Sequence, residues 1–325
     1  MVKAIDRIRS AARGLQQRPR LVKALRLALL LVTLVICVWA VRSQWGEAWP
    51  LLQHARIGYV VLAFLTVSVY YLVFILGWMR ILDAWGIRVP YHAALQAEMV
   101  SMLAKYIPGA VWTPAARTIA LRRQANVTDT PTVLASILVE AALSAISGVI
   151  VFVISLAWVD GTDAPLWALI TFAVLLASLL HPRIFRPLSR KALKPFGAHD
   201  LEPLPFATTL GLLLFYCGTW VIGGFAVWFM LLSLGVSPSL AVVPFLGGVS
   251  AVGAIVAVLA FFAPSGLGAR EASMYGLLLA VTSAGPALGV TVMNRFLITI
   301  VEVALFSVGL LVWRIGRAAA EARST

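Results

Sequence analysis

Residues 98–123 read EMVSMLAKYIPGAVWTPAARTIALRR, and this stretch holds the main clue to the fold. Most of its residues are apolar, as in a membrane-spanning helix, yet Glu98 and Lys105 lie within the apolar run. Residues 108–109 are Pro-Gly; proline removes a backbone donor and glycine permits unusual torsions, so a helix should end near residue 106. Residues 113–114 are Thr-Pro, typical of an N-cap followed by proline at the first helical position. The stretch predicts two half-length helices joined by a break.

The composition places this broken segment in a polytopic membrane protein. Of 325 residues, 61% are hydrophobic and 12% are charged, and the mean hydropathy is +0.95, which excludes an ordinary soluble domain. The net charge is +13, but the basic residues cluster between apolar segments, so the positive-inside rule explains them and no nucleic-acid partner is expected. The two cysteines lie in apolar runs and no metal-ligand spacing is present, so we predict no disulfide, metal or cofactor.

The apolar segments predict the number of spans, because a bilayer core of about 30 Å needs about 20 apolar residues per helix. Two apolar regions, 92–120 and 240–287, are interrupted by proline and glycine. We therefore predict an all-α transmembrane bundle of about six full spans plus two broken or re-entrant hairpins, with eight or more helices in all. The predicted full spans are residues 24–41, 59–79, 132–158, 165–180, 206–232 and 290–313. The predicted organisation is a basic amphipathic segment (1–23), one transmembrane domain (24–315) and a short cytoplasmic tail (316–325).

Loop charges orient these spans. Residues 1–26 carry eight Lys or Arg and residues 182–205 carry five, whereas residues 159–165 carry two Asp and no basic residue. The positive-inside rule then places both termini in the cytoplasm. Region 92–120 would enter from the cytoplasm and region 240–287 from outside, as an inverted repeat would produce. The alternative counts each hairpin as two complete spans.

The second interrupted region contains its own break, FFAPSGLGAREASMYG at residues 261–276. Pro264 is expected to end one helix, Ser265 to cap the next, and Gly266 and Gly268 to keep the turn free of side chains. The new helix carries Arg270 and Glu271 near its start. Both breaks thus have the same order: an apolar helix, proline with glycine, a helix start and then an arginine, either Arg117 or Arg270.

The arginine after each break suggests an anion site. An arginine in the first turn opposes the helix dipole at a cost of about 0.3–1 kcal/mol, and burying it in a membrane costs about 2.5–3.5 kcal/mol more. A bound anion would offset both costs, and phosphate is the anion most often bound at a helix N-terminus. In the alternative, Arg270 pairs with Glu271 or another acid, and Arg117 faces the cytoplasm.

Further charges lie within predicted spans, namely Glu140, Arg295 and Glu302. Arg295 and Glu302 are seven residues apart, so they share a helix face but lie about 10.5 Å apart along the axis and cannot bond directly. Glu98 and Lys105 have the same spacing. Such groups predict the lining of a path for an anionic or zwitterionic headgroup, while inter-helix ion pairs that only fix packing are the alternative. Small residues in 215–224 (FYCGTWVIGG) and 245–254 (FLGGVSAVGA) predict close helix contacts.

The motifs KYIPGAVW and PSGLGAREA, about 155 residues apart, resemble the two signatures of the lysylphosphatidylglycerol synthase transmembrane region, a flippase-like family. Its members typically carry K-Y-[LI]-P-G-x-[VI]-W and P-[GS]-G-[LIV]-G-x-R-E. The resemblance covers roughly residues 20–315. Position 110 is Ala where a polar or basic residue is more usual, and Ala141 replaces an arginine found in many members. The resemblance implies functional roles for Lys105, Tyr106, Pro108, Gly109, Trp112, Glu140, Pro264, Gly266, Gly268, Arg270, Glu271 and Arg295.

The resemblance implies a lipid flippase module rather than an enzyme. Bifunctional members add a cytoplasmic domain that uses aminoacyl-tRNA, and no such domain is expected within this sequence. We expect a transporter of the bacterial inner membrane that moves a phosphate-bearing lipid, with the acids balancing charge or carrying protons. The alternatives are an intramembrane lipid-modifying transferase and a non-transporting membrane partner of a glycosyltransferase. A lipid biosynthetic enzyme, a glycosyltransferase and a second copy of the chain are open as partners.

Overall fold

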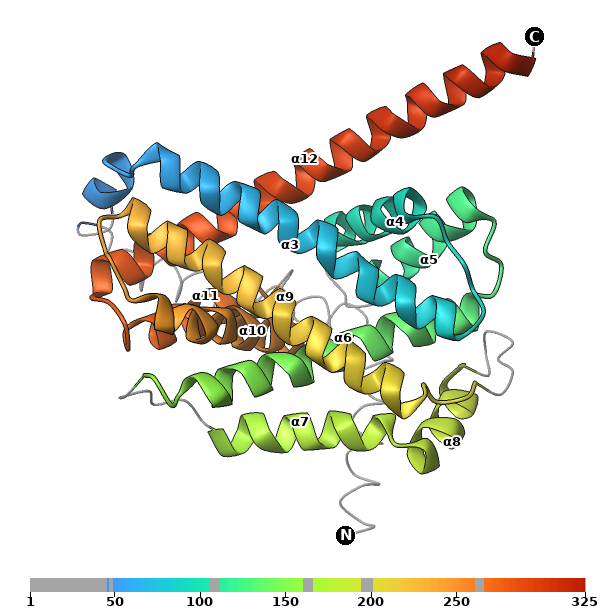
Figure 1. The fold of residues 1–325 in the computed structure, drawn as a ribbon, viewed down its shortest axis with the longest axis horizontal. Coiled ribbons are helices and arrows are strands. Elements are labelled where there is room, and N and C mark those ends of the chain that lie inside the picture. Colours follow the sequence, from blue (N-terminus) through green and yellow to red (C-terminus); the bar gives the residue numbers. More distant parts are fainter. Residues whose placement is uncertain are drawn as a thin grey trace, which may run out of the picture.

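The computed structural model describes residues 46, 49–105, 112–159, 166–193, 201–260 and 266–324, with backbone only for 192–193 and 312–324. All regular elements in these residues are helical, which confirms the predicted all-α bundle (Figure 1). The predicted segment 1–23 and first span 24–41 lie outside the described residues, as do Tyr106, Pro108, Gly109, Pro264 and Ser265.

Five helices of the described chain are long and apolar enough to cross a membrane. Four of them match predicted spans: α3 (Ile57–Ala84), α6 (Thr130–Ser155), α9 (Phe206–Ser233) and α12 (Ala284–Ser324). The fifth is the turn η2 (Leu240–Val242) together with α10 (Val243–Leu259), which form a stretch of 20 residues. By length and composition this stretch suits a complete crossing rather than the half crossing first predicted for the region.

The predicted span at 165–180 corresponds to helix α7 (Leu166–Leu180). Its 15 residues are about 22 Å long, less than the bilayer core, so α7 reaches the length of a span only together with the helix that follows, and the described residues then hold up to six candidate spans. The chain then bends by 75° into α8 (Pro182–Leu193), a basic helix in a region predicted to be a loop. Pro182 explains the bend, because proline disfavours helical torsions in the residue before it and begins a new helix readily.

Helix α12 continues as one helix of 41 residues to Ser324, through most of the predicted tail (316–325). Hydropathy ends the apolar stretch near residue 313, but residues 314–323 are rich in Ala and Arg. These are strong helix formers, so the backbone continues helical beyond the apolar span.

Two short helices form the predicted first hairpin. Helices α4 (Tyr91–Ala104) and α5 (Trp112–Ala125) have 14 residues each, about 21 Å, and pack against one another (Figure 1). Neither is long enough to cross the bilayer core alone. The second interrupted region likewise pairs α10 with the short α11 (Ala269–Leu278).

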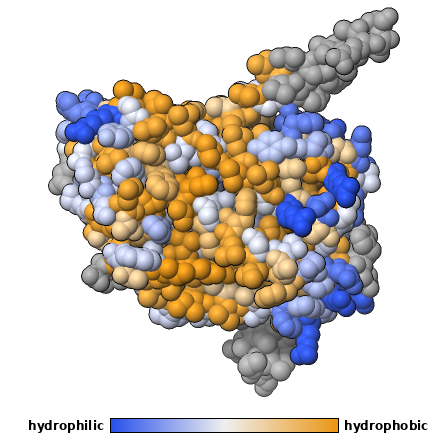
Figure 2. All heavy atoms as spheres, in the orientation of Figure 1, coloured by the Kyte–Doolittle hydropathy of each residue, from blue (hydrophilic) through white to orange (hydrophobic). Residues whose placement is uncertain are grey.

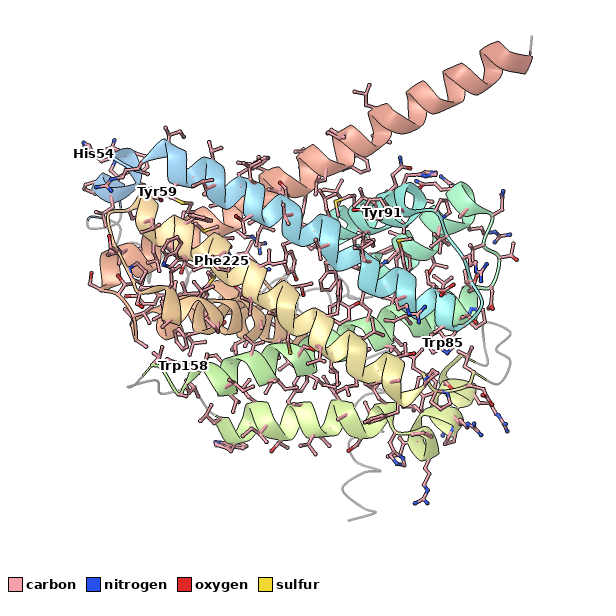
Figure 3. All side chains as sticks on the ribbon, in the orientation of Figure 1. His54, Tyr59, Trp85, Tyr91, Trp158 and Phe225 are labelled. Atoms are coloured by element: carbon pink, nitrogen blue, oxygen red, sulfur yellow. The ribbon has the colours of Figure 1, made fainter. Side chains whose placement is uncertain are left out.

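The two interrupted regions start from opposite ends of the bundle. His54, Tyr59 and Trp158 mark one end and Trp85 the other (Figure 3). Helix α4 begins at the Trp85 end, whereas η2 and α10 follow α9 at the His54 end (Figure 1). At the His54 end, the Arg56 amide before α3 donates to the Ser233 carbonyl at the end of α9 at 2.9 Å. The face drawn in Figure 2 carries an apolar band, with polar residues gathered toward the two ends.

Glycines bring α9 and α10 into backbone contact, as predicted from their small residues. A Cβ at Gly224 would overlap the Val243 carbonyl oxygen, and one at Gly247 would overlap the Trp220 carbonyl oxygen. Each backbone therefore occupies the space that a side chain on the other helix would need. This contact holds α10 against α9, while α10 also packs on α6 and α11.

Candidate functional site

The first charged group in the interior joins three helices through Arg117 of α5. Its Nη1 donates to Glu140 Oε2 of α6 at 2.5 Å, and its Nη2 lies 2.8 Å from Glu98 Oε2 of α4. All three side chains are at most 4% exposed. We call these residues the buried triad. It places two carboxylates against one guanidinium.

Aromatic side chains complete the triad. The Arg117 guanidinium stacks on the Trp78 ring with 3.6 Å from Cζ to the centroid, an arrangement that stabilises a cation. Tyr216 of α9 donates its hydroxyl to Glu140 Oε1 at 3.5 Å, and Trp78 Nε1 donates to Ser136 Oγ at 2.8 Å. Glu140 therefore accepts bonds from two helices.

Glu98 is held less completely than Glu140. Despite the 2.8 Å approach, the angles give neither oxygen of Glu98 a hydrogen bond, and Arg117 Nε also has none, within the part of the chain that the structure describes. Buried polar atoms without partners are uncommon and costly. The triad thus has one well-bonded carboxylate and one that is held by charge alone.

The sequence did not predict this role for Arg117. It neither faces the cytoplasm, since it is buried, nor stands free for a ligand, since both carboxylates already contact it. Glu140 is one end of an inter-helix ion pair with Arg117. Glu98 and Lys105 share a helix but join different groups.

The second charged group links α3, α4 and α12 at the end of the first half-helix. Lys105 Nζ donates to Glu302 Oε1, and the Tyr71 hydroxyl donates to the same oxygen at 2.5 Å. Glu302 is fully buried, while the Lys105 side chain is 19% exposed. Nearer the Trp85 end, Gln96 Nε2 donates to the Gly309 carbonyl at 2.5 Å, so α4 and α12 are joined at two levels.

The third charged group lies where α11 begins. Gly268 is the N-cap with φ of 89°, a torsion that favours glycine, and Gly266 has φ of 63°. The Glu271 side chain accepts from the Gly268 amide at 2.7 Å, so it occupies part of the positive helix end where a bound anion was predicted. Arg295 Nη1 of α12 lies 3.3 Å from the other Glu271 oxygen.

Arg270 differs from the other interior arginines. The residue is half-buried, and its guanidinium forms no hydrogen bond or ion pair within the described residues, so it does not pair with Glu271. Its side chain lies beside Gly253 of α10, where a Cβ would be 3.4 Å from Arg270 Cγ. It is close enough to Tyr70, Tyr71 and Lys105 for its charge to act on them, and Arg295 also acts on Lys105.

The second and third groups therefore lie within electrostatic range of one another. Together they hold three cations, Lys105, Arg270 and Arg295, against two carboxylates, Glu271 and Glu302. We call these five residues the basic cluster. Lys105 ends α4 before the first break, and Arg270 and Glu271 begin α11 after the second break. Arg295 and Glu302 come from α12. The basic cluster therefore joins charged residues from both interrupted regions.

A match to a known protein family identifies the kind of protein that carries this arrangement. The model of the lysylphosphatidylglycerol synthase transmembrane region matches residues 24–305, which is most of the chain. The chain belongs to this family. This family member is therefore a multi-pass membrane protein with a lipid-related role. Its sequence has no significant match among curated proteins.

Several residues of the site were not predicted from the sequence. Tyr71, Trp78 and Tyr216 lie in apolar spans, where aromatic residues usually indicate core packing or an interfacial belt. The available signal was a hydroxyl or indole in the middle of a span, which needs a hydrogen-bond partner there. Trp112, which was predicted to line the path, begins α5 with 48% of its surface exposed. In the described residues, no three His, Cys, Asp or Glu side chains are grouped as metal ligands.

Proposed function

We propose that this member of the family is a lipid transporter, which moves a phosphate-bearing headgroup across the bacterial inner membrane. The proposal rests mainly on Arg270, a half-buried residue whose guanidinium has no ion pair among the described residues. An arginine within a membrane bundle costs about 2.5–3.5 kcal/mol or more when nothing compensates it. A phosphate matches a guanidinium in charge and in bidentate geometry, and would compensate it.

The neighbouring ion pairs support an exchange of partners during transport. The Lys105, Arg295 and Glu271 side chains are 19%, 21% and 26% exposed, so their charges are within reach of an incoming group. In this proposal the phosphate first binds Arg270 and then draws Lys105 or Arg295 away from its carboxylate. Glu302 and Glu271 take these cations back when the headgroup leaves, while the acyl chains stay in the bilayer.

The proposed orientation places the Trp85 end in the cytoplasm. Arg80, Arg88, Arg122, Arg123 and the basic residues of α8 lie in the segments at or near that end, which fits the positive-inside rule. The α4–α5 hairpin would then enter from the cytoplasm and α10 from the outside. Both termini would lie in the cytoplasm, and the two interrupted regions would be related as an inverted repeat.

Reconstitution tests the proposed activity. Purified protein in liposomes is given trace fluorescent lipids whose headgroups are phosphatidylglycerol, an aminoacyl-phosphatidylglycerol or a polyprenyl phosphate, with a neutral glycolipid as the control. A membrane-impermeant quencher reports how much label reaches the outer leaflet. We expect one or more phosphate-bearing lipids to move faster than in protein-free liposomes, and the neutral lipid not to move. If no phosphate-bearing lipid moves faster, the proposal fails.

The same liposomes distinguish transport from chemistry. A transporter leaves the covalent structure of its lipid unchanged, so mass spectra before and after incubation should be identical. A new lipid mass that appears only with protein would instead indicate an intramembrane transferase, and would contradict the proposal that the chain is not an enzyme.

A further inference from the structure

A groove on the outside of the bundle, away from the charged interior, carries a second inference. It lies between α3 and α9, has a volume of about 410 Å³ and is largely apolar. Its lining includes Gly77 and Arg80 of α3 and Ala207, Thr208, Gly211 and Phe215 of α9. We call it the α3–α9 groove. These helices carry exposed Leu76, Leu210 and Leu214, so the groove opens on a face suited to lipid.

Small residues create the groove. A Cβ at Gly211 would meet no atom within 4 Å, so the groove is open above this glycine. At Gly77 the situation is reversed, because a Cβ there would overlap the hydroxyl end of Tyr216. Tyr216 thus packs against Gly77 and donates its hydroxyl to Glu140 of the buried triad.

The end of the groove nearest Trp85 carries positive charge. Arg80 Nη1 lies 2.9 Å from Asp83 Oδ2, and Arg88 Nε lies 3.4 Å from Oδ1 of the same carboxylate. Two guanidinium groups therefore share one carboxylate, which leaves an excess of one positive charge. The Arg80 side chain is 62% exposed and remains accessible to another anion.

The α9 side of the same end carries a helix N-terminus and a hydroxyl donor. Helix α9 has Pro205 at its N-cap and no side-chain cap within the described residues, so no side chain there offsets the positive end of the helix. Thr209 donates its hydroxyl to the Pro205 carbonyl at 3.1 Å, but the Thr208 hydroxyl has no hydrogen bond within the described part of the chain. The groove therefore combines an apolar floor with a cation and a hydroxyl donor at one end.

We propose that the α3–α9 groove binds an anionic phospholipid of the surrounding bilayer, with an acyl chain along the apolar floor and the phosphate at Arg80 and Thr208. The charge at the rim selects this occupant over a zwitterionic lipid. This is a peripheral lipid site, and it does not depend on the transport proposed for the basic cluster.

Glycine substitutions test the site with a matched control. Gly211→Leu places a side chain in the open groove, whereas Gly58→Leu places one in equally open space at the far end of α3. Detergent-purified protein is titrated with phosphatidylglycerol or phosphatidylcholine and analysed by native mass spectrometry. We expect wild type and Gly58→Leu to retain phosphatidylglycerol preferentially, and Gly211→Leu to lose at least about tenfold in apparent affinity. A thermal melt of each variant confirms that it is folded.

A second test removes the positive charge of Arg80 at the end of the groove. Arg80→Gln should weaken phosphatidylglycerol binding about fivefold, which corresponds to about 1 kcal/mol for one basic residue near an anionic lipid surface. It should weaken phosphatidylcholine binding less, because the choline cation already offsets the charge of that lipid's phosphate. Equal binding of the two lipids by wild type would overturn the proposal. So would unchanged phosphatidylglycerol binding by a folded Gly211→Leu protein, or a dimer that Gly211→Leu dissociates without any effect on lipid.

Discussion

Lys105 and Glu302, 197 positions apart in the sequence, form an ion pair that fixes the end of the first half-helix against the last span. The Tyr71 hydroxyl donates to the same carboxylate oxygen at 2.5 Å, so α3, α4 and α12 meet at one buried acid. An ion pair and a hydrogen bond therefore hold the end of α4 against α12 and α3. This placement brings Lys105 close to Arg270 and Arg295.

Removing the acid should destabilise this junction. Glu302→Met leaves Lys105 and Tyr71 without their shared acceptor, and breaking a buried pair from one side costs about 3–5 kcal/mol. The double variant Lys105→Met with Glu302→Met should recover much of that loss, because no unpaired charge remains. Thermal unfolding in detergent measures both. Arg186→Gln breaks an exposed pair with Glu202 and serves as the control, with an expected cost below about 1 kcal/mol. A Glu302→Met protein as stable as wild type would contradict the assigned role.

The two carboxylates of the buried triad should respond differently to substitution. Glu140 accepts hydrogen bonds from Arg117 and Tyr216, whereas Glu98 oxygens accept none within the described residues. We expect Glu140→Met to lower the unfolding temperature more than Glu98→Met does. The reverse order would show that the hydrogen bonds do not determine which acid matters.

A triple variant separates structure from transport at the same place. Replacing Glu98, Arg117 and Glu140 together by methionine removes every charge of the triad, and such replacements of buried ion networks are often neutral or stabilising. If the triad serves only packing, the folded triple variant should move lipid in the liposome assay at the wild-type rate. A folded but inactive triple variant would instead assign the triad a part in transport.

The close contact of α9 and α10 predicts a contrast between two glycines on one helix. At Gly224 an added Cβ would overlap the backbone of α10, while at Gly218 it would meet nothing within 4 Å. Gly224→Ala should therefore destabilise the protein by about 1–3 kcal/mol. Gly218→Ala should be neutral or stabilising, because alanine favours the helix by up to about 1 kcal/mol. Equal melting temperatures for the two variants would contradict the contact.

The sequence predicted the elements of the site better than the pairs they form. Proline with glycine at 108–109 and 264–268 identified two interrupted helices, because backbone geometry is encoded locally. The partners of Arg117 could not be predicted in this way, since they come from two other helices that lie 19 and 23 residues away in sequence. The capping of α11 by Glu271 was likewise not predicted, because its N-cap is a glycine rather than Ser or Thr.

Spans were predicted from apolar length, but the ends of two helices depend on other residues. Helix α7 ends before Pro182 and is shorter than a full span by itself, and α12 continues beyond its apolar run because Ala and Arg keep the backbone helical. Hydropathy predicts burial in lipid and not the end of a helix.

The transport rate of an Arg270→Gln variant tests the central claim most directly. Arg270 has no ion pair to lose among the described residues, and its charge is costly when no lipid is bound, so the variant should melt at or above the wild-type temperature. Its initial rate of phosphate-lipid transport should fall at least about tenfold, as expected for the loss of a charge-assisted contact of about 1.5–3 kcal/mol. Arg123→Gln, which removes an exposed arginine at the end of α5, is the matched control and should transport normally. A folded Arg270→Gln protein that moves the lipid at the wild-type rate would contradict the claim that Arg270 binds the headgroup phosphate.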